Sequence, residues 1–277
     1  MRISVRLLPA LTLLLAASTA SAQGGDSSPG PRPLDTQPGP RLQTFEPIYF
    51  IGGTRKEETT AKVQLSFKVS VFDEGGLVGK PVPPLATLHF GYTQTAVWSL
   101  SEESKPFRDT SYKPSVFYLE PATWTTADGR YNLALEGGYQ HESNGKDGSS
   151  SRSIDILYVR PEWRSVLDDG RFLLIAPKLW GYLDKADNPD IQRYRGYFDL
   201  NLRAGYVDGL QVSTNYRKGT ATVGAVQVDV SYPLGRPESG RPWAYLLVQY
   251  FGGYGETLLE YNVKGLAQLR IGLAVVR

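Results

Sequence analysis

A histidine and a serine two residues apart are the first candidates for chemistry in this 277-residue chain. They are His141 and Ser143, in the segment YNLALEGGYQHESNG, which ends at Gly145. A serine hydroxyl becomes a strong nucleophile when a neighbouring imidazole accepts its proton, and a carboxylate that orients the imidazole completes a catalytic triad. Upstream odd-numbered residues such as Leu133 and Leu135 are apolar, so the pair continues the apolar face of a predicted strand. What this face contacts therefore decides what the pair can do.

The candidate carboxylate is Asp155, on the next predicted strand at 153–163. If the two strands form a hairpin whose turn is centred on Gly148, then Asp155 lies directly opposite His141. Opposed side chains on one face of a sheet have Cβ atoms about 5 Å apart. Serine, histidine and carboxylate would then converge on one face. A polar hairpin end with an Asn-Gly turn explains the same residues without chemistry, and spacing alone leaves this alternative open.

The N-terminal residues predict export from the cytoplasm. Residues 1–22 contain two arginines, an apolar run and a final Ala-Ser-Ala, which is the pattern of a secretory signal peptide. A membrane anchor is the alternative, but the apolar run is short for a helical span. Residues 23–42 are rich in Gly, Pro and Ser and are predicted to form a flexible leader.

Composition excludes several classes of function. Residues 1–22 hold two arginines and no acidic residue, so 28 Lys+Arg face 28 Asp+Glu in the remaining chain. This balance argues against a nucleic-acid partner, which requires a basic surface. The chain has no cysteine, which excludes disulfides and cysteine-bound zinc. The two histidines, His89 and His141, are too few for a multi-histidine metal site.

Apolar and polar residues alternate along most of the chain after residue 43. About twelve segments alternate in this way, from 47–54 to 264–277, and many approach the ten residues that a tilted strand needs to cross a bilayer. No helical periodicity of useful length and no apolar run near 18 residues is present. The 17 tyrosines and five tryptophans suit the aromatic girdles of a membrane barrel.

Two architectures use alternating strands, namely a soluble sandwich or barrel with an apolar core and an outer-membrane barrel with an apolar outer wall. Strand length, even strand number, aromatic content and the export signal favour the second. We predict an all-β fold, a transmembrane antiparallel β-barrel of about 12 strands over residues 43–277, in the outer membrane of a Gram-negative cell. If 47–54 starts from the periplasm, the connections 99–112 and 144–152 are both external. Arg277 departs from the C-terminal aromatic residue that such barrels usually carry.

The segment GYQHESNGKDGSSSRSIDILYVRPEW, residues 138–163, resembles the signature region of outer-membrane phospholipase A, a twelve-stranded barrel lipase. Segments 91–117, 187–198 and 253–262 resemble that family in the same order. The resemblance covers most of 45–277. It implies a calcium-dependent serine hydrolase that releases fatty acids from the sn-1 and sn-2 acyl esters of outer-membrane phospholipids and is active as a homodimer.

The resemblance also assigns roles to residues of the predicted triad. The family's H-x-S-N-G motif implies that Ser143 is the nucleophile and His141 the general base. The third member, usually Asn, falls on Asp155, which is a departure from the family pattern. The family stabilises the oxyanion with the backbone N–H that corresponds to Gly145, together with calcium.

Calcium and dimer contacts follow from the same resemblance. It implies that the ion is bound by the Ser151 hydroxyl and the Lys146 carbonyl of one subunit and by a serine carbonyl of its partner, a role that falls on Ser104. Asp187 resembles an acidic residue of another calcium site. Gln94 shares the parity of lipid-facing residues, where an amide is costly unless it finds a partner. Its parity predicts a protein–protein contact, and the family's interface glutamine matches it.

The prediction is therefore a phospholipase A1/A2 whose substrate approaches from the bilayer. Two alternatives stay open. One is a small porin or structural barrel without enzymatic activity, in which the polar cluster has no role. The other is a hydrolase acting on lipid A or another acylated lipid. Acyl release from phospholipid with calcium distinguishes the three.

Overall fold

The computed structural model describes residues 42–73, 75–235 and 242–277. The predicted signal peptide, 1–22, and the predicted leader up to residue 41 lie outside the described residues. Leu42, assigned to the leader from its sequence, lies in a short strand, β1 (Leu42–Gln43), which pairs with β3.

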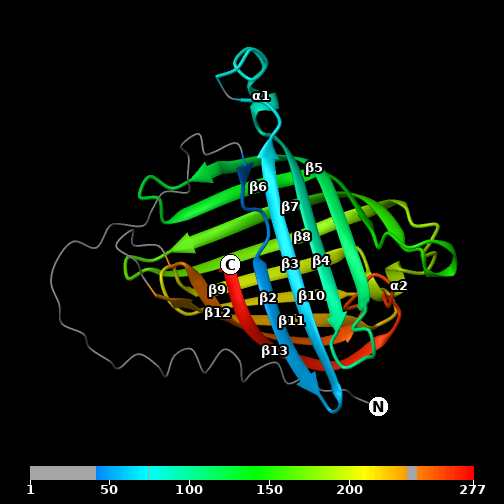
Figure 1. The fold of residues 1–277 in the computed structure, drawn as a ribbon. Coiled ribbons are helices and arrows are strands. Elements are labelled where there is room, and N and C mark those ends of the chain that lie inside the picture. The colour runs from blue at the N-terminus through cyan, green and yellow to red at the C-terminus, as the bar shows by residue number, and fades with distance from the viewer. Residues whose placement is uncertain (1–41, 74, 236–241) are drawn as a thin grey trace, which may run out of the picture. The chain divides into compact units, whose positions relative to one another are not determined.

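A closed antiparallel barrel forms the described part of the chain (Figure 1). Of its thirteen described strands, β1 is a two-residue addition, and the other twelve pair each with the next in sequence. Pairing of β13 with β2 closes the ring. The twelve strands are β2 (Ile48–Arg55), β3 (Glu58–Ser70), β4 (Leu88–Ser99), β5 (Phe107–Thr125), β6 (Tyr131–Ser143), β7 (Ser153–Val166), β8 (Arg171–Asp184), β9 (Phe198–Tyr206), β10 (Gln211–Lys218), β11 (Gly224–Leu234), β12 (Ala244–Tyr254) and β13 (Lys264–Val276).

The predicted twelve-stranded barrel is thus confirmed, and β5 is longer than expected. Alternation predicts a strand over 113–121 after a connection at 99–112, whereas β5 begins at Phe107 and ends at Thr125. The connection between β4 and β5 is therefore shorter than the predicted 99–112. The first residues of β5 include Asp109 and Ser111, which point inward and are buried. Arg108 and Thr110, which alternate with them, are polar as well, so the start of the strand has no apolar face that alternation could reveal.

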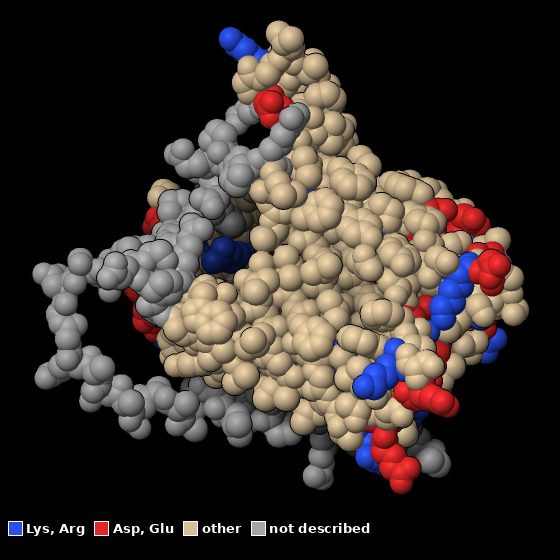
Figure 2. All heavy atoms as spheres, in the orientation of Figure 1, with Lys and Arg blue, Asp and Glu red and all other residues tan. Residues whose placement is uncertain are grey.

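Apolar side chains cover the outer wall of the barrel. Leu65, Leu157, Leu179 and Leu269 are about half exposed, as are many others on the same face of their strands. On the face shown in Figure 2, a broad belt of the wall carries no Lys, Arg, Asp or Glu, and charged residues gather at the end that carries α2 (Gln192–Arg195). An outward apolar belt is the surface that a membrane barrel presents to lipid.

The described residues contain no helix that is both long enough and apolar enough to cross a membrane.

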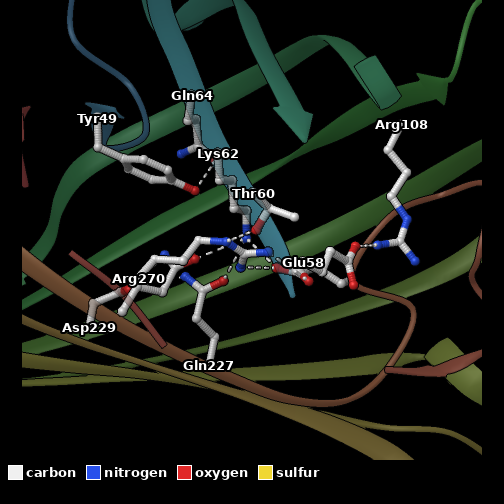
Figure 3. A network of polar contacts seen from close by, with 11 residues as sticks. Tyr49, Glu58, Thr60, Lys62, Gln64, Arg108, Gln227, Asp229 and Arg270 are labelled. Carbon is white, nitrogen blue, oxygen red and sulfur yellow. Dashed lines mark hydrogen bonds and ion pairs between the residues drawn. The ribbon is translucent and has the colours of Figure 1, made fainter. Parts of the chain in front are cut away.

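Polar side chains fill the barrel interior around a cavity of about 700 Å³. Lys62, Asp229 and Arg270 belong to a network of polar contacts in the interior (Figure 3). Lys62 Nζ donates to Gln249 Oε1 at 3.1 Å, and Gln249 Nε2 donates to Asp229 Oδ1 at 2.8 Å. Arg270 pairs with Glu256 at 2.5 Å, and Lys62 lies 3.6 Å from the same carboxylate. Charged side chains can be buried when they are paired and hydrogen-bonded. This network therefore explains why the inward face of the strands can be polar.

The connections predicted to be external lie together at the α2 end. The antiparallel order places the β4–β5 connection (100–106), the β6–β7 connection (144–152) and the β8–β9 connection (185–197) at one end of the barrel. The β12–β13 connection (255–263) lies there too, and its Leu258 and Tyr261 pack in a buried cluster with Ile154 and Ile191. The β6–β7 connection contains one 3₁₀ turn, η1 (Gly148–Ser150). The other short helix, α1 (Pro83–Ala86), lies in the β3–β4 connection at the opposite end.

Arg277 lies at the end of the barrel opposite α2. Its guanidinium donates to the carbonyl oxygens of Gly209 at 2.7 Å and Val207 at 3.2 Å. The same group stacks over the ring of Tyr245, 4.1 Å from the ring centre. Arg277 therefore ties β13 to the β9–β10 turn and to β12 by hydrogen bonds and a cation–π contact.

Candidate active site

The β6–β7 hairpin places the predicted triad residues in the predicted register. His141 pairs with Asp155, and Ser143 pairs with Ser153. Exposed Leu157, on the face of Asp155, contrasts with buried Ile154 and Ile156 on the other face. The three candidate side chains therefore lie on the outer wall, close to the α2 end of the barrel.

His141 and Asp155 form a direct contact. His141 Nδ1 lies 2.8 Å from Asp155 Oδ1. A proton on Nδ1 donates to the carboxylate, which leaves Nε2 free to accept a proton from a nucleophile. Both side chains are partly exposed, 32% for His141 and 24% for Asp155, so the contact is open to a molecule at the barrel wall.

Ser143 lies two residues beyond His141 on the same face of β6. Its hydroxyl forms no hydrogen bond with any residue that the structure describes. The geometry thus brings together the base and its orienting acid and leaves the nucleophile beside them. Since catalytic hydrogen bonds are often long before substrate binds, this arrangement is compatible with a catalytic triad.

The turn after Ser143 is organised by the buried side chain of Asn144. Asn144 Nδ2 donates to the Ser150 carbonyl at 2.9 Å. Asn144 Oδ1 accepts from the backbone N–H of Arg152 at 3.0 Å and of Lys146 at 3.3 Å. These bonds join both sides of the β6–β7 connection, so the backbone beside Ser143 is held in one conformation.

Gly145 adopts a left-handed conformation, with φ of 67°. A Cβ atom at this position would lie 3.0 Å from Tyr112 Cε2, so glycine meets both a backbone and a packing requirement. Within the described part of the chain, the Gly145 N–H donates to no acceptor. A free N–H two residues from a candidate nucleophile suits an oxyanion donor.

The residues predicted to bind calcium are partly brought together. Ser151 Oγ donates to Asp187 Oδ2 at 2.7 Å, and Ser153 Oγ lies 3.3 Å from the same oxygen. Lys146 shares the β6–β7 connection with Ser151, and Ser104 lies in the β4–β5 connection at the same end. Among the described residues, no group of three or more His, Cys, Asp or Glu could hold a metal ion. Hydroxyl, carboxylate and carbonyl oxygens are nevertheless the ligands that calcium prefers.

Neighbouring connections anchor the segment that carries Asp187. Asn188 Nδ2 donates to the Ser153 carbonyl at 2.5 Å. Tyr261 Oη donates to Asp190 Oδ1 at 2.5 Å. Burial and this bond to Asp190 raise the pKa of Tyr261 to about 12, so its hydroxyl remains a donor at neutral pH.

Gln94 faces outward in the middle of β4, as its parity predicts. Leu65 and Tyr112 are its neighbours on the adjacent strands. Gln94 Oε1 accepts from Tyr92 Oη at 3.0 Å, while its amide N–H groups have no acceptor among the described residues. Two donors on an apolar wall are available to a second molecule. His89, the other histidine, is buried inside the barrel, with Nδ1 2.8 Å from the Thr87 carbonyl.

Two residues near the site, Tyr139 and Glu142, were not predicted from the sequence. Tyr139 Oη donates to Asp155 Oδ1 at 2.5 Å. Alternation places Tyr139 on the same face as His141, but it does not predict which side chain the Tyr139 hydroxyl contacts. Glu142 lies between His141 and Ser143 and points inward, where it pairs with Arg195 of α2 at 2.9 Å. No local pattern signals that pair, because its members are 53 residues apart.

Comparison with known proteins identifies relatives over most of the chain. The family model of phospholipase A1 matches residues 43–276. Phospholipase A1 of Salmonella typhimurium is 34% identical over 233 residues, which cover 80% of this chain and 70% of that protein. Phospholipase A1 of Escherichia coli K12 is 31% identical over 229 residues, with the same coverage of 80% and 70%.

Solved structures agree with these matches. Outer membrane phospholipase A from Escherichia coli superposes with a TM-score of 0.69 and 27% identity, covering 84% of this chain and 91% of that chain. The Salmonella typhi outer membrane phospholipase, solved as a dimer with bound calcium, gives a TM-score of 0.68 and 27% identity over 84% of this chain and 92% of that one.

Proposed function

The chain belongs to the phospholipase A1 family and is an outer-membrane β-barrel protein, and on this premise we propose that it hydrolyses the acyl esters of membrane phospholipids. The observation that carries the proposal is the 2.8 Å contact between His141 and Asp155 on the outer wall, beside Ser143. In a soluble protein an apolar face is core. On a membrane barrel it contacts lipid, so a nucleophile there meets acyl esters.

In the proposed mechanism, Ser143 Oγ attacks the ester carbonyl while His141 Nε2 accepts its proton. Asp155 holds the opposite ring nitrogen and stabilises the imidazolium. The Gly145 N–H donates to the oxyanion of the tetrahedral intermediate. His141 then protonates the leaving alcohol, which departs as the lysophospholipid. Water, deprotonated by His141, hydrolyses the acyl-serine and releases the fatty acid. Both sn-1 and sn-2 esters are substrates in this proposal.

Calcium is part of the proposal, with the Ser151 hydroxyl, the Lys146 carbonyl and the partner subunit's Ser104 carbonyl as ligands. Bound there, the ion would supply positive charge next to the oxyanion site. The 2.7 Å contact between Ser151 and Asp187 supports an oxygen-rich rim here, and Asp187 is proposed as a ligand of another calcium site. The Salmonella typhi relative, a dimer with bound calcium, supports the proposal that calcium binds.

The active form is proposed to be a homodimer. Gln94 supports this because its amide N–H groups project from an apolar wall, where an unpaired donor is costly. A second copy of the chain would offer the matching acceptor. Since one calcium ligand would come from the partner, the monomer would lack a complete site.

Fatty-acid release from phosphatidylcholine in mixed micelles tests the proposal. Wild-type protein with calcium is expected to release fatty acid, and Ser143→Ala is expected to lose activity by at least about 1,000-fold. Ser149→Ala is the control, because it removes an exposed serine of the β6–β7 connection and leaves the triad side chains in place. Full activity of Ser143→Ala contradicts the mechanism. Acyl release from lipid A alone indicates a lipid A deacylase, and no release from any lipid indicates a porin or structural barrel.

A further inference from the structure

Tyr139 and His141 share one acceptor atom on the outer wall. Tyr139 Oη donates to Asp155 Oδ1 at 2.5 Å, and His141 Nδ1 lies 2.8 Å from the same oxygen. Asp155 is thus held by two side chains of the neighbouring strand. Neither contact involves a loop, since Tyr139 and His141 belong to β6 and Asp155 to β7.

The strand register accounts for this arrangement. His141 is directly opposite Asp155, and Tyr139 is opposite Leu157. Tyr139 is therefore the diagonal neighbour of Asp155, at a separation of roughly 7–8 Å that an aromatic side chain can span. The phenol lies along the wall and delivers its hydroxyl to the carboxylate.

Asp155 needs such a donor because it lies on an apolar wall. Exposed Leu157 is its neighbour on the same face of β7, and an apolar surround disfavours the charged form of a carboxylate unless hydrogen bonds stabilise it. In the described residues, His141 and Tyr139 provide the only hydrogen bonds to the Asp155 carboxylate.

We propose that Tyr139 is a positioning residue of the active site. Its hydroxyl keeps Asp155 ionised and aimed at His141, so that His141 carries its proton on Nδ1 and presents Nε2 to Ser143. The inference rests on the proposed function, since it concerns the same reaction. A hydrogen bond from a neutral donor to a charged acceptor is roughly twice as strong as one between neutral groups, which makes the single hydroxyl significant.

Tyr139→Phe tests the proposal, because it removes the hydroxyl and keeps the ring and the apolar wall. The readout is kcat and KM for fatty-acid release from mixed micelles with calcium. We expect kcat to fall about tenfold, with KM within about twofold of wild type, because substrate contacts are unchanged. Tyr131→Phe is the matched control. Tyr131 lies on the same face of β6 with similar exposure, 39% against 38% for Tyr139, and stacks on Trp163 instead of binding a carboxylate.

A double-mutant cycle separates positioning from general damage. In an Asp155→Asn background the acceptor is neutral, so Tyr139→Phe is expected to lower kcat by no more than about threefold. Equal losses in both backgrounds, or wild-type kcat in Tyr139→Phe, overturn the proposal. Folding is checked by heat-modifiable migration on gels, and Tyr139→Leu, which also keeps an apolar wall, is read in the same way if the phenylalanine variant does not fold.

Ser143→Ala is assayed in parallel to separate this inference from the proposed function. Activity in Ser143→Ala refutes the function itself. An inactive Ser143→Ala beside a fully active Tyr139→Phe refutes only the role of Tyr139.

Discussion

Neutralising Glu142 tests whether the inner face of β6 holds the site in place. Glu142 lies between His141 and Ser143 in the sequence of β6 but points into the barrel. There it is buried and pairs with Arg195 at 2.9 Å. It also accepts from Ser111 Oγ at 2.7 Å and lies 3.9 Å from Lys113 Nζ. Glu142→Gln keeps the shape of the side chain and removes its charge.

Glu142→Gln is expected to lower the free energy of unfolding because it leaves the buried charge of Arg195 without a carboxylate. Arg195 is 7% exposed, and its only described carboxylate partner is Glu142. Removing one member of a buried ion pair costs about 3–5 kcal/mol, because the other charge stays buried and uncompensated. The glutamine amide can still accept from Ser111, so we expect the free energy of unfolding to fall by about 3 kcal/mol, at the lower end of this range.

Urea unfolding of the protein in lipid vesicles measures this loss, with Glu136→Gln as the control. Glu136 lies on the same strand, is similarly buried and pairs with Arg160 at 2.9 Å. Both variants are expected to lose comparable stability. Only Glu142→Gln should also lower kcat under conditions where both are folded, since Arg195 belongs to the connection that carries Asp187. A loss below about 1 kcal/mol, or an equal fall of kcat in both variants, refutes the reasoning.

Three further predictions concern metal, backbone and pH. Chelation of calcium should abolish acyl release, and calcium addition should restore it; activity that survives chelation contradicts the calcium site. Gly145→Ala should lower kcat by at least about tenfold, because the new Cβ meets both positive φ and the Tyr112 ring; wild-type kcat contradicts the oxyanion assignment. Burial opposes the charge on Glu256, but Lys62 and Arg270 hold its pKa below the ordinary value of 4.5. The stability that ionised Glu256 contributes is therefore complete above pH 4.5 and is lost as pH falls further. The free energy of unfolding, measured with urea, should therefore fall more steeply over that acid range in wild type than in Glu256→Gln.

The barrel could be predicted from sequence because its two faces differ at every second residue. The contact between His141 and Asp155 followed for the same reason, since one turn length fixes the register of a hairpin and thereby every opposed pair. Parity and the position of a turn are enough to predict such pairs. The prediction therefore succeeded for residues that lie opposite each other on adjacent strands.

Contacts that depend on reach or on distant segments could not be predicted in this way. The bond from Tyr139 is diagonal and depends on the length of a ring. The pair of Glu142 with Arg195 depends on how the β8–β9 connection folds back over the barrel, which alternation does not encode. The start of β5 could not be predicted because polar residues occupy both of its faces, Asp109 and Ser111 on the inner face and Arg108 and Thr110 in alternation with them.

The central claim, that Ser143 is a nucleophile facing lipid, is tested most directly by covalent labelling. A long-chain sulfonyl fluoride in detergent, with calcium, is expected to modify one serine per chain, found by mass spectrometry in the peptide that contains Ser143. Activity should fall in proportion to labelling, and His141→Ala should label far more slowly, because the hydroxyl then lacks its base. A label on another serine, or a fully labelled protein that still releases fatty acid, contradicts the account.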